Sequence, residues 1–289
     1  MKTIAVLPSG SVSDEAARHF FQNEDIQWKY HRLISDVFLS TVNGVSDYSI
    51  IPIENTIEGS VSLHMDWLVH EVDLPIQAEW VYPSIQNLIG RQSETLSEDG
   101  TVDYSKITKV ISHPVAIAQC LQFLRTHLPH AVTEHVSSTA EGVRIVQNNP
   151  NAGWAAIGTK TAAANEKLDV IASEITDHDN NYTRFLLVGS EPYTARQSEQ
   201  KKTSILVTLP EDYAGALHQV LAAFAWRKIN LSRIESRPTK KKLGNYYFFI
   251  DIDMALDTVL LPSALQEIEA IGCQVRVLGS YPSFTENKK

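Results

Sequence analysis

Residues 3–53 read TIAVLPSGSVSDEAARHFFQNEDIQWKYHRLISDVFLSTVNGVSDYSIIPI, and this stretch decides the fold. Three runs rich in β-forming residues, 3–7, 26–31 and 47–53, alternate with helical patterns over 11–23 and 34–42. A βαβαβ order of this kind predicts a parallel sheet covered by helices. We expect the first domain to be an α/β domain.

The same alternation continues on the C-terminal side of this stretch. A helix over 61–70 and two β-rich runs, 74–82 and 84–90, are followed by a polar segment without periodicity, 91–105, which we interpret as an exposed excursion. The pattern then predicts strands over 109–112, 131–136, 153–157, 169–173 and 184–189, with helices over 114–127, 140–148 and 161–165. This is the pattern of a doubly wound sheet.

A change of pattern marks a second domain. Residues 190–202 are polar, contain Pro192 and are interpreted as a linker. Strands are then predicted over 203–209, 229–237, 244–253 and 274–281, with helices over 215–227 and 260–271. The order βαββαβ is that of the ferredoxin-like split unit.

Size and charge limit the function classes. The chain has 289 residues, of which 43% are hydrophobic, enough for two domains with cores. Its net charge of −9 disfavours nucleic acid as a partner. Cys120 and Cys273 lie in separate apolar stretches, which is typical of buried thiols in a reducing compartment, and no apolar run is long enough to span a bilayer. We expect a cytoplasmic protein.

Hydroxyl side chains stand at the starts of several predicted helices. Ser11, Ser112-His113, Ser137-Ser138 and Thr159 each precede a helical pattern, and Pro114 occupies a first-turn position. In an open α/β sheet, helix N-termini gather at the carboxyl ends of the strands, where ligands bind. Free N–H groups there favour an anion, so an acidic protein can bind an acidic small molecule.

Two polar loops adjoin predicted strands. Residues 51–61, with Glu54, Asn55 and Thr56, close one strand, and residues 177–185 lead into another. On a regular strand Thr183 and Phe185 share one face and Arg184 takes the other. Thr183 and Arg184 therefore reach one ligand only if Thr183 lies at an irregular strand mouth.

The sequence offers no metal or cofactor motif. The histidines and cysteines lack ligand spacing, and Gly-x-Ser-x-Gly, Gly-x-Gly-x-x-Gly and Walker patterns do not occur. We expect no metal and no organic cofactor.

Five motifs in order resemble the prephenate dehydratase family over nearly the whole chain. In the first domain they are Pro52-Ile53-Glu54-Asn55-Thr56 with Gly59 and Val61, Ser112-His113-Pro114 with Ala118-Gln119-Cys120, and Asn181-Tyr182-Thr183-Arg184-Phe185. In the second, Gly215-Ala216-Leu217 and Ile229-Asn230-Leu231 with Ile234-Glu235-Ser236-Arg237-Pro238 resemble the phenylalanine-binding motifs of an ACT domain. The chain departs from the family pattern at Leu7, Val12, Val115, Ala214 and His218.

The resemblance implies a fold and its boundaries. Residues 1–190 would form a two-lobed catalytic domain like the type II periplasmic binding proteins, and 202–282 an ACT domain. One lobe would contain 1–78 and 170–188, the other 79–169, with hinge crossings near Glu79 and Val170.

The resemblance also implies a reaction, the conversion of prephenate to phenylpyruvate, water and carbon dioxide. By family position, Thr183 would donate to the departing hydroxyl, with Glu54 or His113 as the proton source behind it. The implied catalytic residues are Thr183, Asn55, Gln119, Ser112 and Glu54, and the implied substrate-binding residues are Arg184, Phe185, Thr56, Ser11 and His113.

For the second domain the resemblance implies control by L-phenylalanine. The implied site is formed by Gly215, Ala216, Leu217, Asn230, Leu231, Glu235, Ser236, Arg237 and Pro238. Because a βαββαβ sheet has helices on one face only, its other face or an edge strand needs a partner, and we expect a homodimer or homotetramer. An ACT-type module that has lost its ligand is the alternative.

Two other functions remain open. One is an arogenate dehydratase, whose substrate differs by an amino group, and the other is a non-catalytic sensor of a small acid that dimerises through its ACT domain. Since no chorismate mutase segment precedes the first strand, we expect a monofunctional enzyme.

Overall fold

A computed structural model of the protein describes residues 1–211, 213–239 and 246–285. The chain divides into two compact units. The first contains residues 1–71 and 81–185, and the second contains 72–80 and the described residues from 186 on. The chain passes between the units within strands β5 (Ile76–Pro83) and β11 (Tyr182–Val188).

The first sheet of the first unit has the predicted βαβαβ order. Strand β1 (Lys2–Val6) pairs in parallel with β2 (Ile26–Tyr30) and β3 (Tyr48–Asn55), and β11 follows β3 in the strand order. Helices α1 (Val12–Phe20) and α2 (Ile34–Val42) connect the strands. Consecutive residues of β1 and β3 are fully buried, as expected for a parallel sheet covered on both faces.

After β3 the chain turns back on itself. Strand β4 (Gly59–Ser60) pairs antiparallel with β3, and α3 (Ser62–Asp66) continues as a π-helical turn, Trp67–Glu71. The predicted helix over 61–70 is confirmed in place, although its second half has the wider π geometry.

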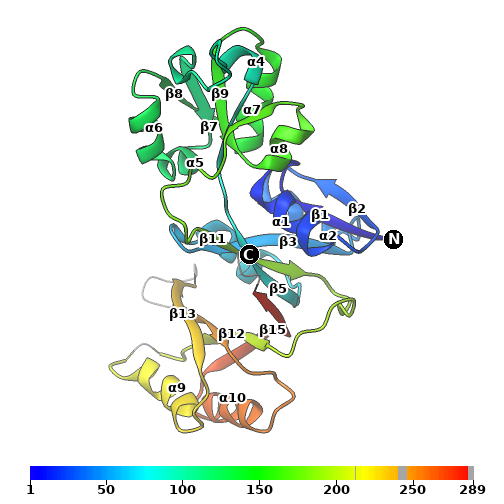
Figure 1. Ribbon diagram of the computed structural model, residues 1–289. Coiled ribbons are helices and arrows are strands. Elements are labelled where there is room, and N and C mark those ends of the chain that lie inside the picture. Colours follow the sequence, from blue (N-terminus) through cyan, green and yellow to red (C-terminus); the bar gives the residue numbers. More distant parts are fainter. Residues whose placement is uncertain (212, 240–245, 286–289) are drawn as a thin grey trace. The chain divides into compact units, whose positions relative to one another are not determined.

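The second sheet of the first unit has the order β10-β6-β9-β7-β8. Its strands are β6 (Asn87–Gly90), β7 (Lys109–Ser112), β8 (Val132–His135), β9 (Trp154–Gly158) and β10 (Asp169–Ala172), and its helices are α5 (Pro114–Ala118), α6 (Leu121–His127), α7 (Thr139–Asn148) and α8 (Lys160–Asn165). Figure 1 shows α5 and α6 on one side of these strands and α7 and α8 on the other. Neighbouring residues such as Val110 and Ile111 accordingly belong to different core clusters.

Two expectations for this lobe are corrected. The helix over 114–127 is broken at Gln119 and Cys120, where α5 ends and α6 begins. Strand β10 pairs with β6, so residues 169–172 belong to the second sheet rather than to the first lobe. The strand pairing therefore shows that the chain crosses between the two lobes at residues 84–86 and 173–181, and not near Glu79 and Val170 as expected.

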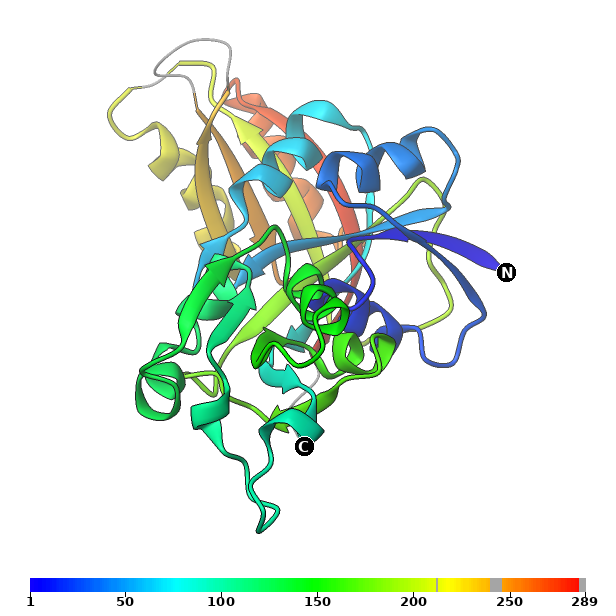
Figure 2. The same ribbon diagram turned by 90° about the horizontal axis from the view of Figure 1, so that it is seen from above.

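Residues 91–105 project from the second sheet as the predicted excursion (Figure 2). The segment contains helix α4 (Gln92–Thr95) and a 3-10 turn, Tyr104–Lys106, that ends it. An isolated bridge between Leu96 and Val102 closes its tip.

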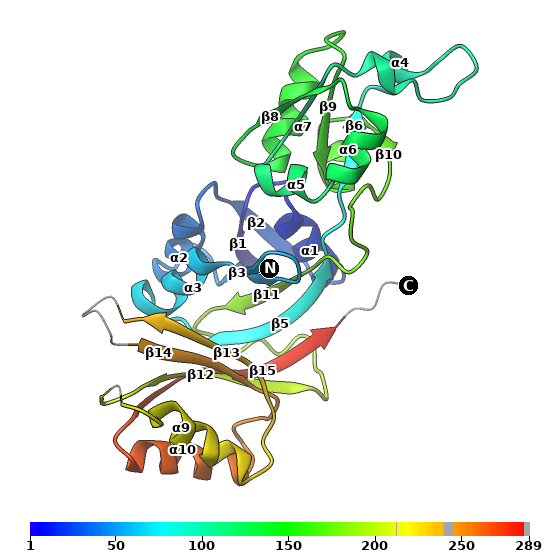
Figure 3. The ribbon, with the colours of Figure 1, turned by 90° about the vertical axis from the view of Figure 1, so that its left-hand side faces the viewer.

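The second unit has the predicted βαββαβ order. Strands β12 (Lys201–Thr208), β13 (Leu231–Pro238), β14 (Tyr246–Ile252) and β15 (Gln274–Thr285) form antiparallel pairs in the order β13-β14-β12-β15. Helices α9 (Ala216–Ala225) and α10 (Leu260–Ala270) lie on the same side of these strands (Figure 3). The predicted linker ends at residue 200, because 201 and 202 already pair with β15, and the predicted strand start at 244 lies outside the described residues.

Strand β5 extends this sheet beyond β15. The two backbones approach closely at Gly279, where a Cβ would lie 2.4 Å from the carbonyl oxygen of Ile76. Glu79 on β5 is 1% exposed, pairs with Lys202 at 2.9 Å and accepts a 2.6 Å hydrogen bond from Ser283. These bonds explain why residues 72–80, which we expected at the end of the first lobe and at its hinge, group with the second unit.

On the opposite side of the sheet from α9 and α10, several side chains are buried. Ser204 and Asp251 are 0% and Tyr281 is 1% exposed, and the Ser204 hydroxyl hydrogen-bonds both Asp251 and Tyr281. Part of this face is therefore buried, while the expectation of a partner at this face or at an edge strand stays a prediction.

Two further observations concern the whole described chain. Cys120 and Cys273 are both buried free thiols, and burial raises the pKa of each. No helix within residues 1–211, 213–239 and 246–285 is both long enough and apolar enough to cross a membrane.

Candidate active site

A cavity of about 660 Å³ lies between the two sheets of the first unit. Its wall is built from the loops after β3, the starts of α1, α5 and α7, and the first half of β11. Six of the predicted site residues line it, namely Ser11, Asn55, His113, Gln119, Thr183 and Phe185. The cleft brings together segments that are more than a hundred residues apart in the chain.

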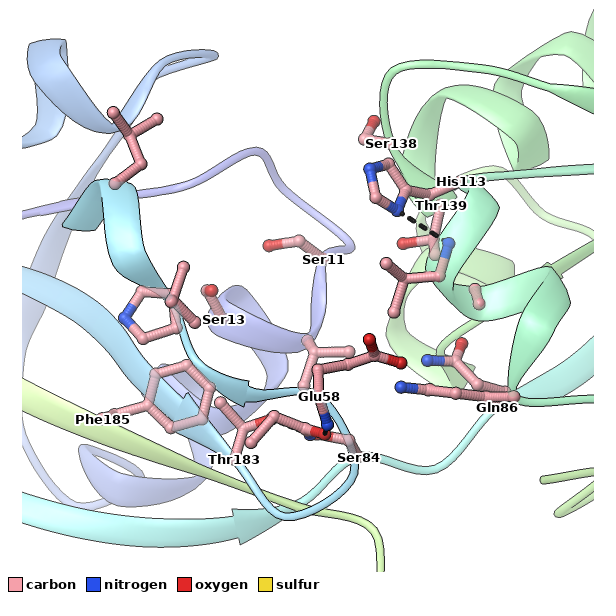
Figure 4. A pocket seen from close by; sticks show the side chains of 18 of the residues that line it. Ser11, Ser13, Glu58, Ser84, Gln86, His113, Ser138, Thr139, Thr183 and Phe185 are labelled. Atoms are coloured by element: carbon pink, nitrogen blue, oxygen red, sulfur yellow. Dashed lines mark hydrogen bonds between the residues drawn. The ribbon is translucent and has the colours of Figure 1, made fainter. Parts of the chain in front are cut away.

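Thr183 and Phe185 lie side by side in the cleft wall (Figure 4). Both belong to β11, which is regular from Tyr182, so the two side chains share the face turned to the cavity. Thr183 is 8% exposed. The irregular strand mouth that would bring Arg184 to the same ligand is not observed.

Asn55 fixes the position of the Thr183 hydroxyl. Its Oδ1 accepts hydrogen bonds from the backbone N–H groups of Ile57 and Glu58, at 2.9 and 3.0 Å. These donors identify the other end of the amide as Nδ2, which donates to Thr183 Oγ1 at 3.0 Å. Thr183 therefore accepts from Asn55 and keeps its own proton for another group.

The amide chain continues through Asn181. Nδ2 of Asn55 donates to Asn181 Oδ1 at 2.8 Å, and Nδ2 of Asn181 donates to Gln119 Oε1 at 3.0 Å. Since Oε1 of Gln119 is an acceptor here, its Nε2 is the end that can donate to a ligand. The break between α5 and α6 places Gln119 at the end of α5, where its side chain joins this row of hydrogen-bonded amides.

Three helix caps face the cleft, as the sequence predicts. Ser11 caps α1, His113 caps α5 and Ser138 caps α7, and all three line the cavity (Figure 4). Thr159 caps α8, but its hydroxyl donates to the carbonyl of Gly10 and does not line the cleft. The α1 and α7 caps direct the positive ends of two helices toward the cavity, which favours an anion there.

The protonation state of His113 follows from its cap. Its Nδ1 accepts a 3.3 Å hydrogen bond from the backbone N–H of Val115, so the proton of the neutral ring is on Nε2. Burial, together with the charge of His135, lowers the pKa of His113 below 6.5. Neutral His113 can therefore donate from Nε2. Figure 4 shows His113 across the cleft from Thr183.

Arg184 and Glu54 lie outside the cavity wall. Arg184 is 8% exposed, and its Nη1 is 3.5 Å from Glu54 Oε2. On a regular strand Arg184 must point away from the face of Thr183. The geometry does not support direct substrate contact by this pair.

The side chains of Ser112 and Thr56 form hydrogen bonds with backbone groups. Ser112 is fully buried and donates to the carbonyl of Ile157 at 2.7 Å. Thr56 donates to the carbonyl of Asn180 and accepts from the N–H of Tyr182, which holds the β3 loop beside the start of β11. Neither side chain lines the cleft.

Cations occur at the edge of the cleft instead. A neighbouring cavity of about 640 Å³ shares Ser11, Ser137 and Ser138 with the first, and Arg32 and Arg144 are in its wall. Glu141 and Glu166 lie in the same wall, so the two arginines supply positive charge at this edge beside two carboxylates.

Sequence reasoning missed four residues at the site. Ser84 Oγ lies 2.6 Å from Thr183 Oγ1, Asn181 joins the amides, and Gln86 and Glu58 line the cavity. Asn181 stands within the quoted motif around Thr183 and Glu58 within the loop 51–61, so local signals existed for both. Ser84 and Gln86 follow Pro83 in a segment that looks only like a strand, and no local signal marks them.

The predicted effector-binding residues all lie in the second unit. Gly215, Ala216 and Leu217 form the start of α9, with Gly215 as the N-cap at a φ of 94°. Asn230 donates to Asp253 at 2.6 Å just before β13, which carries Leu231, Glu235, Ser236, Arg237 and Pro238. Glu235 is paired with Arg233 at 2.6 Å.

Among the residues that the structure describes, no group of three or more His, Cys, Asp or Glu side chains could hold a metal ion.

Comparisons with known proteins show which families the two parts of the chain resemble. Residues 4–193 match the family model "Prephenate dehydratase", and residues 203–272 match the model "ACT domain". The chain is 39% identical to a prephenate dehydratase of Bacillus subtilis, over 98% of this chain and 99% of that protein. It is 38% identical to a prephenate dehydratase of Methanocaldococcus jannaschii, over 97% and 98%.

Solved structures share the fold. A prephenate dehydratase from Arthrobacter aurescens in complex with L-Phe is 31% identical, has a TM-score of 0.85, and is matched over 98% of this chain and 90% of that one. The prephenate dehydratase of Staphylococcus aureus has a TM-score of 0.80 at 28% identity, over 97% and 100%. A quorum-quenching acylase at 21% identity and a TM-score of 0.82 shows the fold alone.

The expected fold class, a two-lobed α/β domain followed by an ACT domain, is confirmed by these matches and by the described topology. With a family model over residues 4–193 and relatives of 38% and 39% identity along nearly the whole chain, the protein belongs to the prephenate dehydratase family.

Proposed function

We propose that the protein converts prephenate to phenylpyruvate, water and carbon dioxide. The bond between the ring and its carboxylate breaks, and the electron pair of that bond enters the ring. The hydroxyl on the opposite ring carbon leaves with the electron pair of its C–O bond. The departing oxygen takes up one proton to become water. The aromatic ring that forms is the driving force, so the enzyme has to hold a dianion and supply that proton in a dry cleft.

The observation that carries this proposal is the position of Thr183. Its hydroxyl faces the cavity beside the apolar ring of Phe185, and its oxygen is held by Asn55 so that its proton can be donated. A hydroxyl donor aimed at a leaving oxygen lowers the barrier because the hydrogen bond strengthens as negative charge develops there.

The other cleft residues bind and orient the substrate. Gln119 donates from Nε2, His113 from its own Nε2, and the α1 cap at Ser11 directs free N–H groups toward a carboxylate. Arg32 and Arg144, rather than Arg184, offset the charge of the incoming dianion. Ser112, Glu54, Thr56 and Arg184 support the site by holding its strands and loops.

We also propose the parts of the chain that perform these tasks. Residues 1–190 catalyse, and 202–282 form the regulatory domain in the cytoplasm, where the buried free thiols stay reduced.

L-phenylalanine is the proposed effector. The A. aurescens relative is described as a complex with L-Phe, and this chain has the ACT-like motifs at the start of α9 and along β13. We propose a homodimer or homotetramer through the ACT domains, with β13 as the contact strand, since it ends the strand order of the described sheet.

One assay tests the proposed function. The absorbance of phenylpyruvate is followed after purified protein is mixed with prephenate, with and without L-phenylalanine, and a parallel reaction with arogenate is analysed for phenylalanine. We expect phenylpyruvate formation that L-phenylalanine reduces. Turnover of arogenate alone would identify an arogenate dehydratase, and binding of either acid without turnover would identify a sensor.

A further inference from the structure

Ser84 is a buried polar residue that none of the roles above uses. It lies just after β5, is 4% exposed and lines the cleft. Its Oγ is 2.6 Å from Thr183 Oγ1, and Figure 4 shows the two side chains together at the base of the cavity. Its backbone is held as well, because Ser84 N donates to Asn181 O and Ser84 O accepts from Asn181 Nδ2.

The direction of the Ser84–Thr183 hydrogen bond depends on whether Thr183 donates to substrate. Thr183 Oγ1 already accepts from Asn55 Nδ2, which has no acceptor capacity. When the single proton of Thr183 points at the departing hydroxyl, the short contact with Ser84 can be a hydrogen bond only if Ser84 is the donor. Substrate binding therefore selects the arrangement Ser84 to Thr183 to substrate.

Ser84 also lines a second, smaller cavity. It has a volume of about 10 Å³, which is about the space of one water molecule, and its wall includes Ser84, Thr176, His178 and Asp179. His178 and Asp179 are exposed and line this cavity, so it lies next to the protein surface. Ser84 is thus the residue that borders both the cleft and this small cavity.

We propose that Ser84 relays a proton to Thr183 during the reaction, and this inference rests on the proposed dehydratase function. As the C–O bond of the substrate breaks, the departing oxygen takes the proton of Thr183, and Thr183 takes the proton of Ser84. In the same concerted step Ser84 takes a proton from solvent at the small cavity, so that no alkoxide is left and solvent is the net source of the one proton consumed. A threonine hydroxyl is too weak an acid to complete this transfer alone, which is why a concerted relay is required.

The test compares Ser84→Ala with wild type in single-turnover and steady-state assays of phenylpyruvate formation. We expect kcat to fall at least about tenfold, which is part of the roughly 10²–10⁴-fold that general acid assistance contributes, and KM to change less than about twofold. In Thr183→Ala, the added Ser84→Ala change should have almost no further effect, since Ser84 acts through Thr183. Ser84→Thr keeps a hydroxyl and should restore most of kcat.

Ser49→Ala is the matched control. Ser49 is fully buried in the same unit, and its hydroxyl donates to Val37 O at 2.6 Å, but it does not line the cleft. We expect it to keep the wild-type kcat.

Should the Ser84 variants fail to fold, the wild type provides a second readout. In single turnovers across mixtures of light and heavy water, two protons in flight give a curved dependence of the rate on deuterium content. A linear dependence, or a Ser84→Ala enzyme with wild-type kcat, overturns the relay. A wild type that makes no phenylpyruvate overturns the proposed function itself.

Discussion

At the scale of single residues, the site works by position rather than by unusual chemistry. Thr183, Asn55 and Gln119 carry neutral side chains, and their hydrogen bonds define which atom donates and which accepts. Two backbone N–H groups on Asn55 Oδ1 orient the whole chain of amides. Donors held in this way need no reorganisation when charge develops on the substrate.

Replacing Thr183 with Ala should therefore affect the chemical step. We expect kcat to fall by roughly 10²–10⁴-fold with KM changed less than about threefold, because the hydroxyl acts mainly in the transition state. Initial rates of phenylpyruvate formation measure both. Thr126→Ala removes an exposed threonine hydroxyl on α6 and should have no effect. Near-normal turnover in Thr183→Ala would exclude it as the donor.

His64 makes the stability of the folded protein depend on pH. Its Nδ1 lies 2.6 Å from the carbonyl oxygen of Pro52, which can only accept, so Nδ1 carries the proton. Burial lowers the pKa of His64 below its ordinary value of 6.5, an effect that outweighs this hydrogen bond. Between the folded pKa and 6.5, the unfolded chain binds more protons than the folded one, so stability falls as pH falls through that window.

His64→Gln should make stability less dependent on pH. The glutamine amide can still donate to Pro52, but it does not titrate. Urea unfolding at about pH 7.5 and about pH 5.5 should show a larger loss of unfolding free energy for wild type than for the variant. Equal losses in the two proteins would contradict a lowered pKa at His64.

At the scale of elements, a few specific contacts hold β5 in the second unit. Its Glu79 is buried between Lys202 of β12 and Ser283 of β15. Gly279 lets the backbone of β15 come close to Ile76. A buried carboxylate without its cation is costly, so this pair keeps β5 attached to the ACT sheet.

Lys202→Met should destabilise the protein by about 3 kcal/mol, because the buried Glu79 carboxylate would lose the Lys202 cation. Lys201→Met is the matched control, since Lys201 pairs with Asp257 at 3.7 Å and both side chains are at least half exposed. We expect about 0.5 kcal/mol or less for the control. Chemical denaturation measures both, and equal effects would show that the Glu79 pair contributes little.

At the scale of the whole molecule, a net charge of −9 accompanies a cleft for a dianion. Positive groups nevertheless lie near the cleft, namely the N-termini of α1 and α7 and the edge residues Arg32 and Arg144, together with the carboxylates of Glu58, Glu141 and Glu166. Local dipoles and short-range donors outweigh distant charges because salt screens the latter over about 10 Å.

Regulation is also a property of the whole chain, and Gly215 gives a way to test it. Gly215 caps α9 at a φ of 94°, a conformation that strains any residue with a side chain. Calorimetry should detect L-phenylalanine binding to wild type. Gly215→Ala should weaken it by roughly fivefold or more, while kcat without effector is retained.

Gly44→Ala is the control for backbone strain alone. Gly44 has a φ of 67° and, like Gly215, no atom within 4 Å of an added Cβ, but it lies in the first unit. Its L-phenylalanine affinity should equal that of wild type. Absence of binding heat and of inhibition in the wild type would instead indicate an ACT module without a ligand.

Much of the fold was predictable because its signals are local. The strand and helix patterns over 3–53, the caps at Ser11 and Ser138, and the βαββαβ order each follow from periodicity and capping chemistry within a few residues. The break at Gln119 and the pairing of β10 with β6 were missed, because both depend on contacts with segments distant in sequence.

The sequence by itself determined the elements, the family and the polar loops from which the site is built. Only the tertiary structure decided which of those polar side chains meet. In β11, Thr183 points into the cleft and Arg184 points away from it, because neighbouring side chains of a strand alternate between its two faces. This alternation could be used only once the structure had shown that β11 is a regular strand from Tyr182 on. The contact of Ser84 with Thr183 joins residues 99 positions apart. No local sequence pattern encodes this contact. It forms when β5 and β11 are brought together by the burial of both strands.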